Sequence, residues 1–287
     1  MRYGGIDEAG YGPTLGPLSI VGVAVDGAPG IDLAKAFAGT GVRDSKTLHR
    51  PGNLAPLEEV ALGGLGWLLG QPPTTAAEVF AALGEKASDR THSWQDGAET
   101  MTLPHSATRV MKWSLKELTP AGVRGRLIHA GEYNHFLATS GNKADLELTL
   151  VGQLLKWIGS TTPAAIVVDR LGGRRFYGEA LGKVWPTATV HIDEESAHAS
   201  RYLIDQRQVA FLVGGESASP LTALASCIAK YARELHMTLF NQWWCRTVPD
   251  LAPTAGYPED ARRWLTVIGA ERYQPLGTQL IRGWPRF

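Results

Sequence analysis

Residues 5–13 read GIDEAGYGP, which sets an acidic pair, Asp7 and Glu8, at the end of a short apolar segment. The glycines and the proline after the pair predict a tight turn, because glycine lets another part of the backbone approach closely. Residues 18–25 (LSIVGVAV) then form an apolar run of strand length. We therefore expect a β-hairpin with two carboxylates where its first strand ends, although acidic pairs near turns are also common as plain surface features.

A second strand-ending carboxylate lies in the middle of the chain. Residues 165–168 (AIVV) form a continuous apolar run that ends at Asp169, and the preceding residues 145–158 have the apolar spacing of a helix. Open α/β sheets usually place ligands and catalytic groups at the carboxyl ends of strands, although a strand-ending aspartate with no such role is commoner. Carboxylates that converge there repel one another unless divalent cations neutralise them, and oxygen ligands favour Mg²⁺ or Mn²⁺. This pattern is typical of two-metal hydrolysis.

The later part of the chain predicts two more strands and a long helix. Residues 189–192 and 209–213 are strand candidates, and Ser219 followed by Pro220 begins a helix expected to end near residue 236. On that helix Glu234 lies with Lys230 roughly opposite the apolar stripe. Glu234 is therefore a metal ligand only if this helix borders a cleft, and a solvated face is the simpler interpretation. A short helix is expected over 259–265, and the chain from 47 to about 126 is interpreted as insertions and loops.

Composition limits the classes of protein that remain. The 287 residues include 28 basic and 28 acidic side chains, so nucleic-acid binding would have to come from local patches rather than net charge. The two cysteines form no Cys-x-x-Cys pair, which argues against a disulfide scaffold or a structural zinc site. No basic and apolar leader follows Met1, and apolar runs such as 60–69 are too short to span a bilayer. We expect a cytoplasmic monomer with no membrane partner.

Several spaced motifs together resemble one family. The run GIDEAGYGP, then Gly16-Pro17 and then Asp44-Ser45-Lys46, resembles the opening signature of type 2 ribonuclease H, a member of the ribonuclease H superfamily. Residues 167–169 (VVD) resemble its third-carboxylate strand, and residues 223–234 (ALASCIAKYARE) resemble its late helix ending in the fourth carboxylate. Residues 255–258 (AGYP) resemble its Lys-Gly-Tyr segment, whose tyrosine packs on the nucleic-acid sugar. The motifs are collinear over most of the chain.

The resemblance implies an α/β ribonuclease H-like fold, with a mixed central sheet flanked by helices. It implies a catalytic domain over 1–245 with insertions around 50–126 and 172–205, and a C-terminal extension over 246–287. The implied activity is endonucleolytic cleavage of RNA paired with DNA, or of ribonucleotides embedded in duplex DNA, leaving a 5′-phosphate and using Mg²⁺ or Mn²⁺. The implied catalytic metal ligands are Asp7, Glu8, Asp169 and Glu234. The expected nucleic-acid contacts are Gly10, Tyr11, Gly12, Ser45, Lys46 and Tyr257, with Arg174 and Lys230 added on grounds of charge.

The chain also departs from the family pattern. The family's Gly-Arg-Gly, which helps to sense the 2′-hydroxyl at an RNA–DNA junction, is Gly10-Tyr11-Gly12 here. Glu234 stands where the family has aspartate, and Arg170 where glycine is usual. Two alternatives therefore remain: a non-cleaving nucleic-acid-binding protein of the same fold, and a nuclease for another structured nucleic acid such as branched DNA. Four acidic positions count against the first, because they would repel without metal, and nothing excludes the second.

Overall fold

A seven-stranded mixed sheet forms the centre of the molecule in the computed structural model, which describes residues 1–50, 52–106 and 108–285. The strand order is β3-β2-β1-β4-β7-β6-β5. Strands β1, β4 and β7 are parallel to one another, and the other neighbours are antiparallel. The bounds are β1 Arg2–Ala9, β2 Leu18–Gly27, β3 Leu118–Ile128, β4 Ala164–Asp169, β5 Val190–Glu195, β6 Ala199–Ile204 and β7 Arg207–Leu212. The predicted hairpin and the mixed sheet flanked by helices are confirmed.

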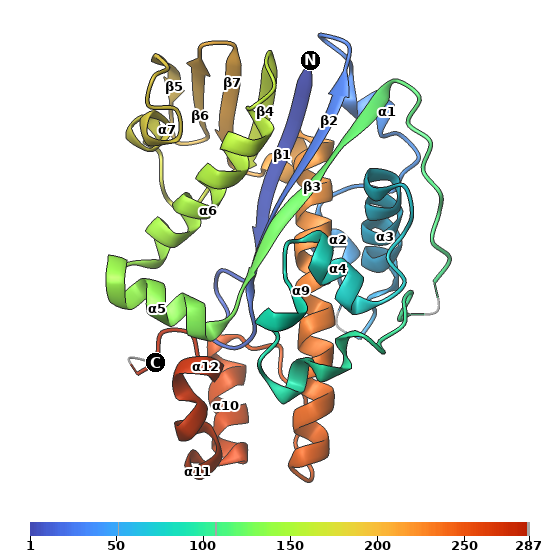
Figure 1. Cartoon of the computed structure of the whole chain (residues 1–287), viewed down its shortest axis with the longest axis vertical. Helices are drawn as coiled ribbons and strands as arrows, with labels where there is room; N and C mark the ends of the chain where they lie inside the picture. Colours follow the sequence, from blue (N-terminus) through green and yellow to red (C-terminus); the bar gives the residue numbers. More distant parts are fainter. Residues whose placement is uncertain (51, 107, 286–287) are drawn as a thin grey trace.

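Helices cover both faces of the sheet (Figure 1), with α6 (Lys143–Ile158) on one face and α9 (Pro220–Thr247) on the other. The remaining helices are α1 Leu33–Ala36, α2 Ser45–Leu48, α3 Ala55–Leu69, α4 Ala76–Ala82, α5 Ala130–Ser140, α7 Gly178–Val184, α8 Gly215–Ala218, α10 Pro258–Ile268, α11 Ala270–Tyr273 and α12 Gly277–Leu280. Short 3₁₀ helices span Ala87–Asp89, Ser93–Ala98 and Gln274–Leu276. None of the helices in the described part of the chain has the length and apolarity needed to cross a membrane.

The first strand fixes which side chains meet which helix. A side chain added at Gly4 would come 2.6 Å from Ile158 of α6, whereas one added at Gly5 would come 2.2 Å from the backbone of Leu221 in α9. Successive residues of a strand point to opposite faces of its sheet. Asp7 therefore lies on the α9 side and Glu8 on the α6 side, so the two acidic side chains point toward opposite helical layers.

The segment from 47 to 126 differs from the loops that were expected. It contains α3, α4 and β3, and its apolar side chains belong to the same core cluster as those of α9. Gly63 and Gly64 within α3 leave room for the Trp113 ring and for Leu224. The glycines that allow this close packing are also residues that disfavour a helix in a prediction from sequence. Strand β6 was not predicted from the sequence either. It lies within the expected insertion around 172–205 and pairs with β7.

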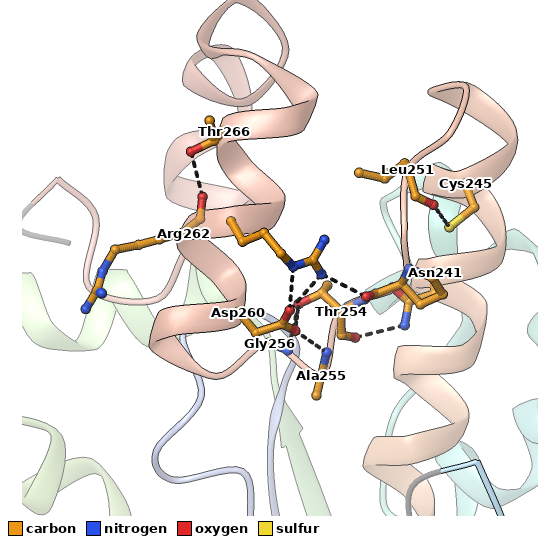
Figure 2. A network of polar contacts seen from close by, with 11 residues as sticks. Asn241, Cys245, Leu251, Thr254, Ala255, Gly256, Asp260, Arg262 and Thr266 are labelled. Carbon is orange, nitrogen blue, oxygen red and sulfur yellow. Dashed lines mark hydrogen bonds and ion pairs between the residues drawn. The ribbon is translucent and has the colours of Figure 1, made fainter.

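The C-terminal segment packs against the far end of α9. The centroids of the Phe240 and Trp244 rings lie within 5.2 Å of the centroid of the Trp264 ring in α10. This packing stabilises the part of α9 beyond residue 236. Figure 2 shows the polar network beside them, in which the Asn241 amide exchanges two 2.9 Å hydrogen bonds with the Thr254 backbone. Thr254 also donates to Asp260, which accepts a second bond from the Ala255 N–H. This network fixes the segment that leads to Tyr257.

Candidate active site

Two carboxylates meet at the carboxyl edge of the sheet, as the sequence predicted. Strand β1 runs parallel to β4, with Ile6 level with Val168, so the next residues, Asp7 and Asp169, stand side by side at the strand ends. Asp7 is 3% exposed, and its Oδ1 accepts a 2.7 Å hydrogen bond from the Glu8 N–H. Parallel pairing thus brings together groups that are about 160 residues apart in the sequence.

A third strand end adds Glu216, which sequence reasoning missed. Strand β7 runs parallel to β4 and is followed by Gly214, whose φ of +69° suits glycine, and by Gly215. The Gly215 N–H donates to Asp169 Oδ1 at 2.7 Å, and a side chain on Gly215 would come 3.1 Å from the Asp169 Cα. The glycine pair therefore lets the start of α8 close onto Asp169. Glu216 follows immediately and is buried beside it.

Contacts from the Ser45–Lys46 turn hold Glu216 in place. The Ser45 N–H donates to one Glu216 oxygen at 2.9 Å, and Lys46 Nζ lies 3.2 Å from the other. Ser45 is itself buried and accepts a hydrogen bond from Ser226 of α9. Ser45 therefore supports the cluster from within, whereas the Lys46 side chain is 79% exposed and its charge faces outward.

The electrostatics of these groups show that they form one cluster. Burial raises the pKa of Asp7 well above its usual range, and repulsion from Glu8, Asp169 and Glu216 adds to the rise. Burial also raises the pKa of Glu8 to about 8, with Glu147 and Asp169 contributing next. Burial likewise raises the pKa of Asp169, although its bond from the Gly215 N–H opposes the rise. Each carboxylate is thus destabilised by burial and by its neighbours, a condition that a bound cation relieves.

Glu147 is a further carboxylate that sequence reasoning missed. It lies on the buried side of α6 and is 1% exposed. Burial raises its pKa to about 7, while the ammonium of Lys143, one turn earlier, opposes the rise. The sequence did carry a signal, because Glu147 interrupts the apolar stripe formed by Leu146, Leu150 and Val151, and an unpaired glutamate is seldom buried.

The side-chain oxygens at this edge suit a hard divalent cation. Among the described residues, none donates a hydrogen bond to the buried atoms Asp7 Oδ2, Glu8 Oε2 or Glu147 Oε1. Buried carboxylate oxygens without donors are costly unless they are protonated or bind a cation, and Mg²⁺ and Mn²⁺ prefer such ligands. Within the same described residues no three His, Cys, Asp or Glu side chains already form a metal site. Binding therefore requires these side chains to turn toward one another.

The sequence predicted Glu234 as a metal ligand, whereas the structure places it outside the cluster of strand-end carboxylates. Ser226, whose hydroxyl lies near Asp7, is eight residues before Glu234, a rise of about 12 Å along α9. Glu234 instead forms ion pairs with Lys230 at 3.0 Å and Arg233 at 3.4 Å. Although burial opposes it, these cations and His49 lower the pKa of Glu234 to about 2. Glu234 is thus a neutralised carboxylate, unlike those at the strand ends.

The glycine-rich turn and Tyr257 do come together beside the cluster. A side chain on Gly12 would lie 4.0 Å from the Tyr257 ring, and Tyr257 is 48% exposed. The Gly256 carbonyl accepts a 2.7 Å hydrogen bond from the Thr14 N–H, which joins the two segments. Gly10 has a φ of +88° and packs against the buried Arg233 side chain, so it shapes the turn from below.

Tyr11 forms a second aromatic group at this edge. Lys143 Nζ lies 4.2 Å from the centroid of its ring, a cation–π contact. Partial burial raises the pKa of Tyr11, and the Glu147 carboxylate adds to the rise, which places the phenol near the acidic cluster. An ammonium and a phenol therefore occupy the region where the family has the arginine of its Gly-Arg-Gly.

The two remaining basic candidates differ in availability. Arg174 lies 3.6 Å from Asp145 on α6, and its side chain remains 33% exposed near the cluster. Lys230 is 19% exposed and is paired with Glu234, so its charge is largely committed within the protein. Arg174 therefore fits a nucleic-acid contact better than Lys230 does.

Glu216 could have been found from the sequence by the reasoning that found Asp169. It follows the strand expected over 209–213 after two glycines, which is again a carboxylate just beyond a buried strand. The acidic end of the helical motif at Glu234 was more conspicuous. Only the pairing of β4 with β7 shows that the first position joins the cluster.

Comparison with known proteins links this geometry to one family. Residues 4–56 match the family model described as Ribonuclease HII. A curated Ribonuclease HII from Thermococcus sibiricus is 48% identical over 48 residues, which cover 17% of this chain. The match spans 20% of that relative's length.

Solved structures share the fold over the whole chain. The ribonuclease H2 from Pyrococcus horikoshii OT3 has a TM-score of 0.54 at 17% identity, covering 99% of this chain and 94% of that one. The RNase HII in a PCNA:RNase HII complex from Archaeoglobus fulgidus has a TM-score of 0.52 at 16% identity, covering 100% and 96%. Bst-RNase HIII in complex with Mn²⁺ has a TM-score of 0.51 at 17% identity, covering 100% and 67%. These structures show that the chain has a ribonuclease H-like fold, and its residues 4–56 match the ribonuclease HII family model.

Proposed function

We propose that this protein is a metal-dependent endoribonuclease that cleaves RNA in RNA–DNA hybrids or ribonucleotides embedded in duplex DNA. The observation that carries the proposal is the set of buried carboxylates at adjacent strand ends, whose unpartnered oxygens lie beside the family's glycine-rich turn. Carboxylates in this state call for divalent cations. The Mn²⁺ complex of Bst-RNase HIII, a protein of the same fold, supports this class of cofactor.

The proposed ligand set is Asp7, Glu8, Asp169 and Glu216, with Glu216 in place of Glu234. These carboxylates would hold two Mg²⁺ or Mn²⁺ ions, which would supply activation of a water and stabilisation of the leaving 3′-oxygen, in a cleavage that leaves a 5′-phosphate. The chain's own groups hold the carboxylates for this task. The Gly215 N–H orients Asp169 through a 2.7 Å bond, and the Ser45 N–H orients Glu216 through one of 2.9 Å.

Recognition of the substrate falls to the groups around the turn. The exposed Tyr257 ring suits packing on a sugar, and the outward charges of Lys46 and Arg174 suit phosphates. Tyr11 offers a ring face and one hydroxyl, without the charged fork of an arginine. We therefore expect runs of RNA in a hybrid to be favoured over a single embedded ribonucleotide, since several weak 2′-hydroxyl contacts replace one strong contact at a junction.

A cleavage assay with two labelled substrates tests the proposal. The purified protein with Mg²⁺ or Mn²⁺ is expected to nick a hybrid duplex, and a DNA duplex with one ribonucleotide more slowly. Asp7→Asn and Glu216→Gln should abolish cleavage while the proteins stay folded. Glu234→Gln is the matched control, because it removes a half-buried carboxylate outside the cluster and should retain activity. Failure to cleave either substrate with either ion, or persistence of cleavage in Asp7→Asn, would overturn the assignment.

A further inference from the structure

The α6 helix carries a buried carboxylate, one oxygen of which accepts no hydrogen bond from the described residues. Glu147 is 1% exposed, and no donor in the described ranges reaches its Oε1 atom. Lys143 stands four residues earlier, the spacing of a helical ion pair, and its ammonium lies 4.2 Å from the centroid of the Tyr11 ring. Burial raises the pKa of Glu147 to about 7, and the charge of Lys143 opposes that rise only in part.

Glu147 lies on the same side of the sheet as Glu8, and its charge contributes to the raised pKa of Glu8. Glu8 lies on the α6 side of β1, because Gly4, at the same parity, abuts Ile158 of α6 and Ile6 shares a core cluster with Leu150. Its Oε2 atom is also buried and without a donor among the described residues. Two neighbouring elements, β1 and α6, thus bury carboxylate oxygens that accept no hydrogen bond from the described residues.

Another buried glutamate of the same chain shows what a purely structural role looks like. Glu58 is 0% exposed, but its carboxylate accepts hydrogen bonds from the His105 N–H at 2.7 Å, the Ser106 N–H at 2.7 Å and the Tyr231 hydroxyl at 2.6 Å. These donors compensate for its removal from water. Glu147 lacks such compensation, so stabilisation of the fold does not account for it.

We infer that Glu147 is an additional ligand of this site, which together with Glu8 holds one divalent cation on the α6 side of the sheet edge. The inference rests on the proposed function, because it assigns a fifth carboxylate to the same metal site. Asp7, Asp169 and Glu216 then serve the α9 side, and Glu8 and Glu147 serve the α6 side. Oxygen ligands from both layers specify Mg²⁺ or Mn²⁺ rather than a softer ion.

Binding of Mn²⁺ by the folded, nucleic-acid-free protein tests this inference without relying on activity. Titration calorimetry and electron paramagnetic resonance would compare wild type with Glu147→Gln. We expect the variant to bind one Mn²⁺ at least about tenfold more weakly, since the loss of even an outer-shell partner costs roughly 10–100-fold in affinity. Its thermal midpoint in EDTA should equal or exceed that of wild type, because an unpartnered buried charge is removed.

Two controls separate ligation from folding. Glu58→Gln should lower the thermal midpoint and leave Mn²⁺ affinity unchanged, and the exposed Glu179→Gln should change neither. If Glu147→Gln does not fold, Glu147→Asp takes its place, because the shorter side chain keeps the charge and withdraws its oxygens from the cation. Unchanged Mn²⁺ stoichiometry and affinity in the folded Glu147 variant would overturn the inference.

Asp7→Asn distinguishes this failure from that of the proposed function. If wild type binds Mn²⁺ and Asp7→Asn weakens binding while the Glu147 variant does not, only the role of Glu147 is refuted. If wild type binds no Mn²⁺, both proposals are refuted together.

Discussion

Replacement of Glu8 by glutamine should stabilise the metal-free protein at alkaline pH. Burial, with Glu147 and Asp169 as neighbours, raises the pKa of Glu8 from its ordinary value of 4.5 to about 8. Between these two values the folded state therefore binds a proton that the unfolded state has released. The free energy of unfolding must then fall as the pH rises through this window, and it is least affected below pH 4.5.

The size of the effect follows from the same pKa values. A rise in pKa from 4.5 to about 8 corresponds to about 5 kcal/mol of lost stability above pH 8, and to about 3 kcal/mol at pH 7. Each kcal/mol moves the thermal midpoint of a chain of this size by roughly 2–4 °C. Glu8→Gln removes the ionisation, so its thermal midpoint in EDTA at pH 8.5 should exceed that of wild type by about 10–20 °C.

Thermal melts in EDTA at pH 4.5, 6.5 and 8.5 provide the measurement. The gap between Glu8→Gln and wild type should widen with pH, and saturating Mg²⁺ should narrow it by stabilising wild type. The exposed Glu179→Gln variant should show no such trend. A gap that stays constant across the three pH values, or a variant less stable than wild type at pH 8.5, would refute the reasoning.

Three other substitutions probe the surroundings of the cluster. Because cations lower the pKa of Glu234 to about 2, its charge stabilises the fold above pH 4.5, and this stability is lost as the pH falls toward 2. Glu234→Gln should therefore lower the free energy of unfolding, measured by chemical denaturation at pH 7, by at most about 3 kcal/mol. The same variant should bind Mn²⁺ as wild type does. Tyr11→Arg should raise the rate of cleavage at a single embedded ribonucleotide relative to the rate on a hybrid duplex. If wild type already prefers the single ribonucleotide and the substitution leaves this ratio of rates unchanged, Tyr11 does not discriminate between the two substrates. Lys46→Met and Arg174→Met should each flatten the dependence of log affinity on log salt by about 0.9 on duplex DNA, whereas binding insensitive to salt would exclude phosphate contacts.

Local sequence pattern was enough to find the carboxylates that end strands. Asp7 and Asp169 each follow an apolar run in the sequence. The parallel pairing of β1 with β4 brings both residues to the same edge of the sheet. Glu216 follows the same rule, but a turn of two glycines separates it from its strand. Its membership depends on the pairing of β7 with β4, a contact between distant segments that no local pattern encodes.

The region from 47 to 126 was harder for a different physical reason. Its helix α3 packs through glycines against Trp113 and Leu224, so the residues that make the contact close are those that weaken the helical pattern. The length of α9 beyond residue 236 likewise depends on the rings of α10, which lie later in the chain. In both places tertiary packing overrides local propensity.

Three glutamates on or beside α9 and α6 show what the fold adds to a residue type. Glu58 accepts hydrogen bonds from three donors and Glu234 forms close ion pairs, whereas among the described residues Glu147 forms no close ion pair and its Oε1 atom accepts no hydrogen bond. In the sequence all three are acids on helices, and the resemblance of residues 223–234 to the late helix of type 2 ribonuclease H suggested the second as a metal ligand. A carboxylate whose charge the protein already neutralises gains little from a cation, whereas one buried without a partner gains most. A buried oxygen without a donor among the described residues, rather than position in a motif, is therefore the property on which we propose Glu8 and Glu147 as ligands in preference to Glu234.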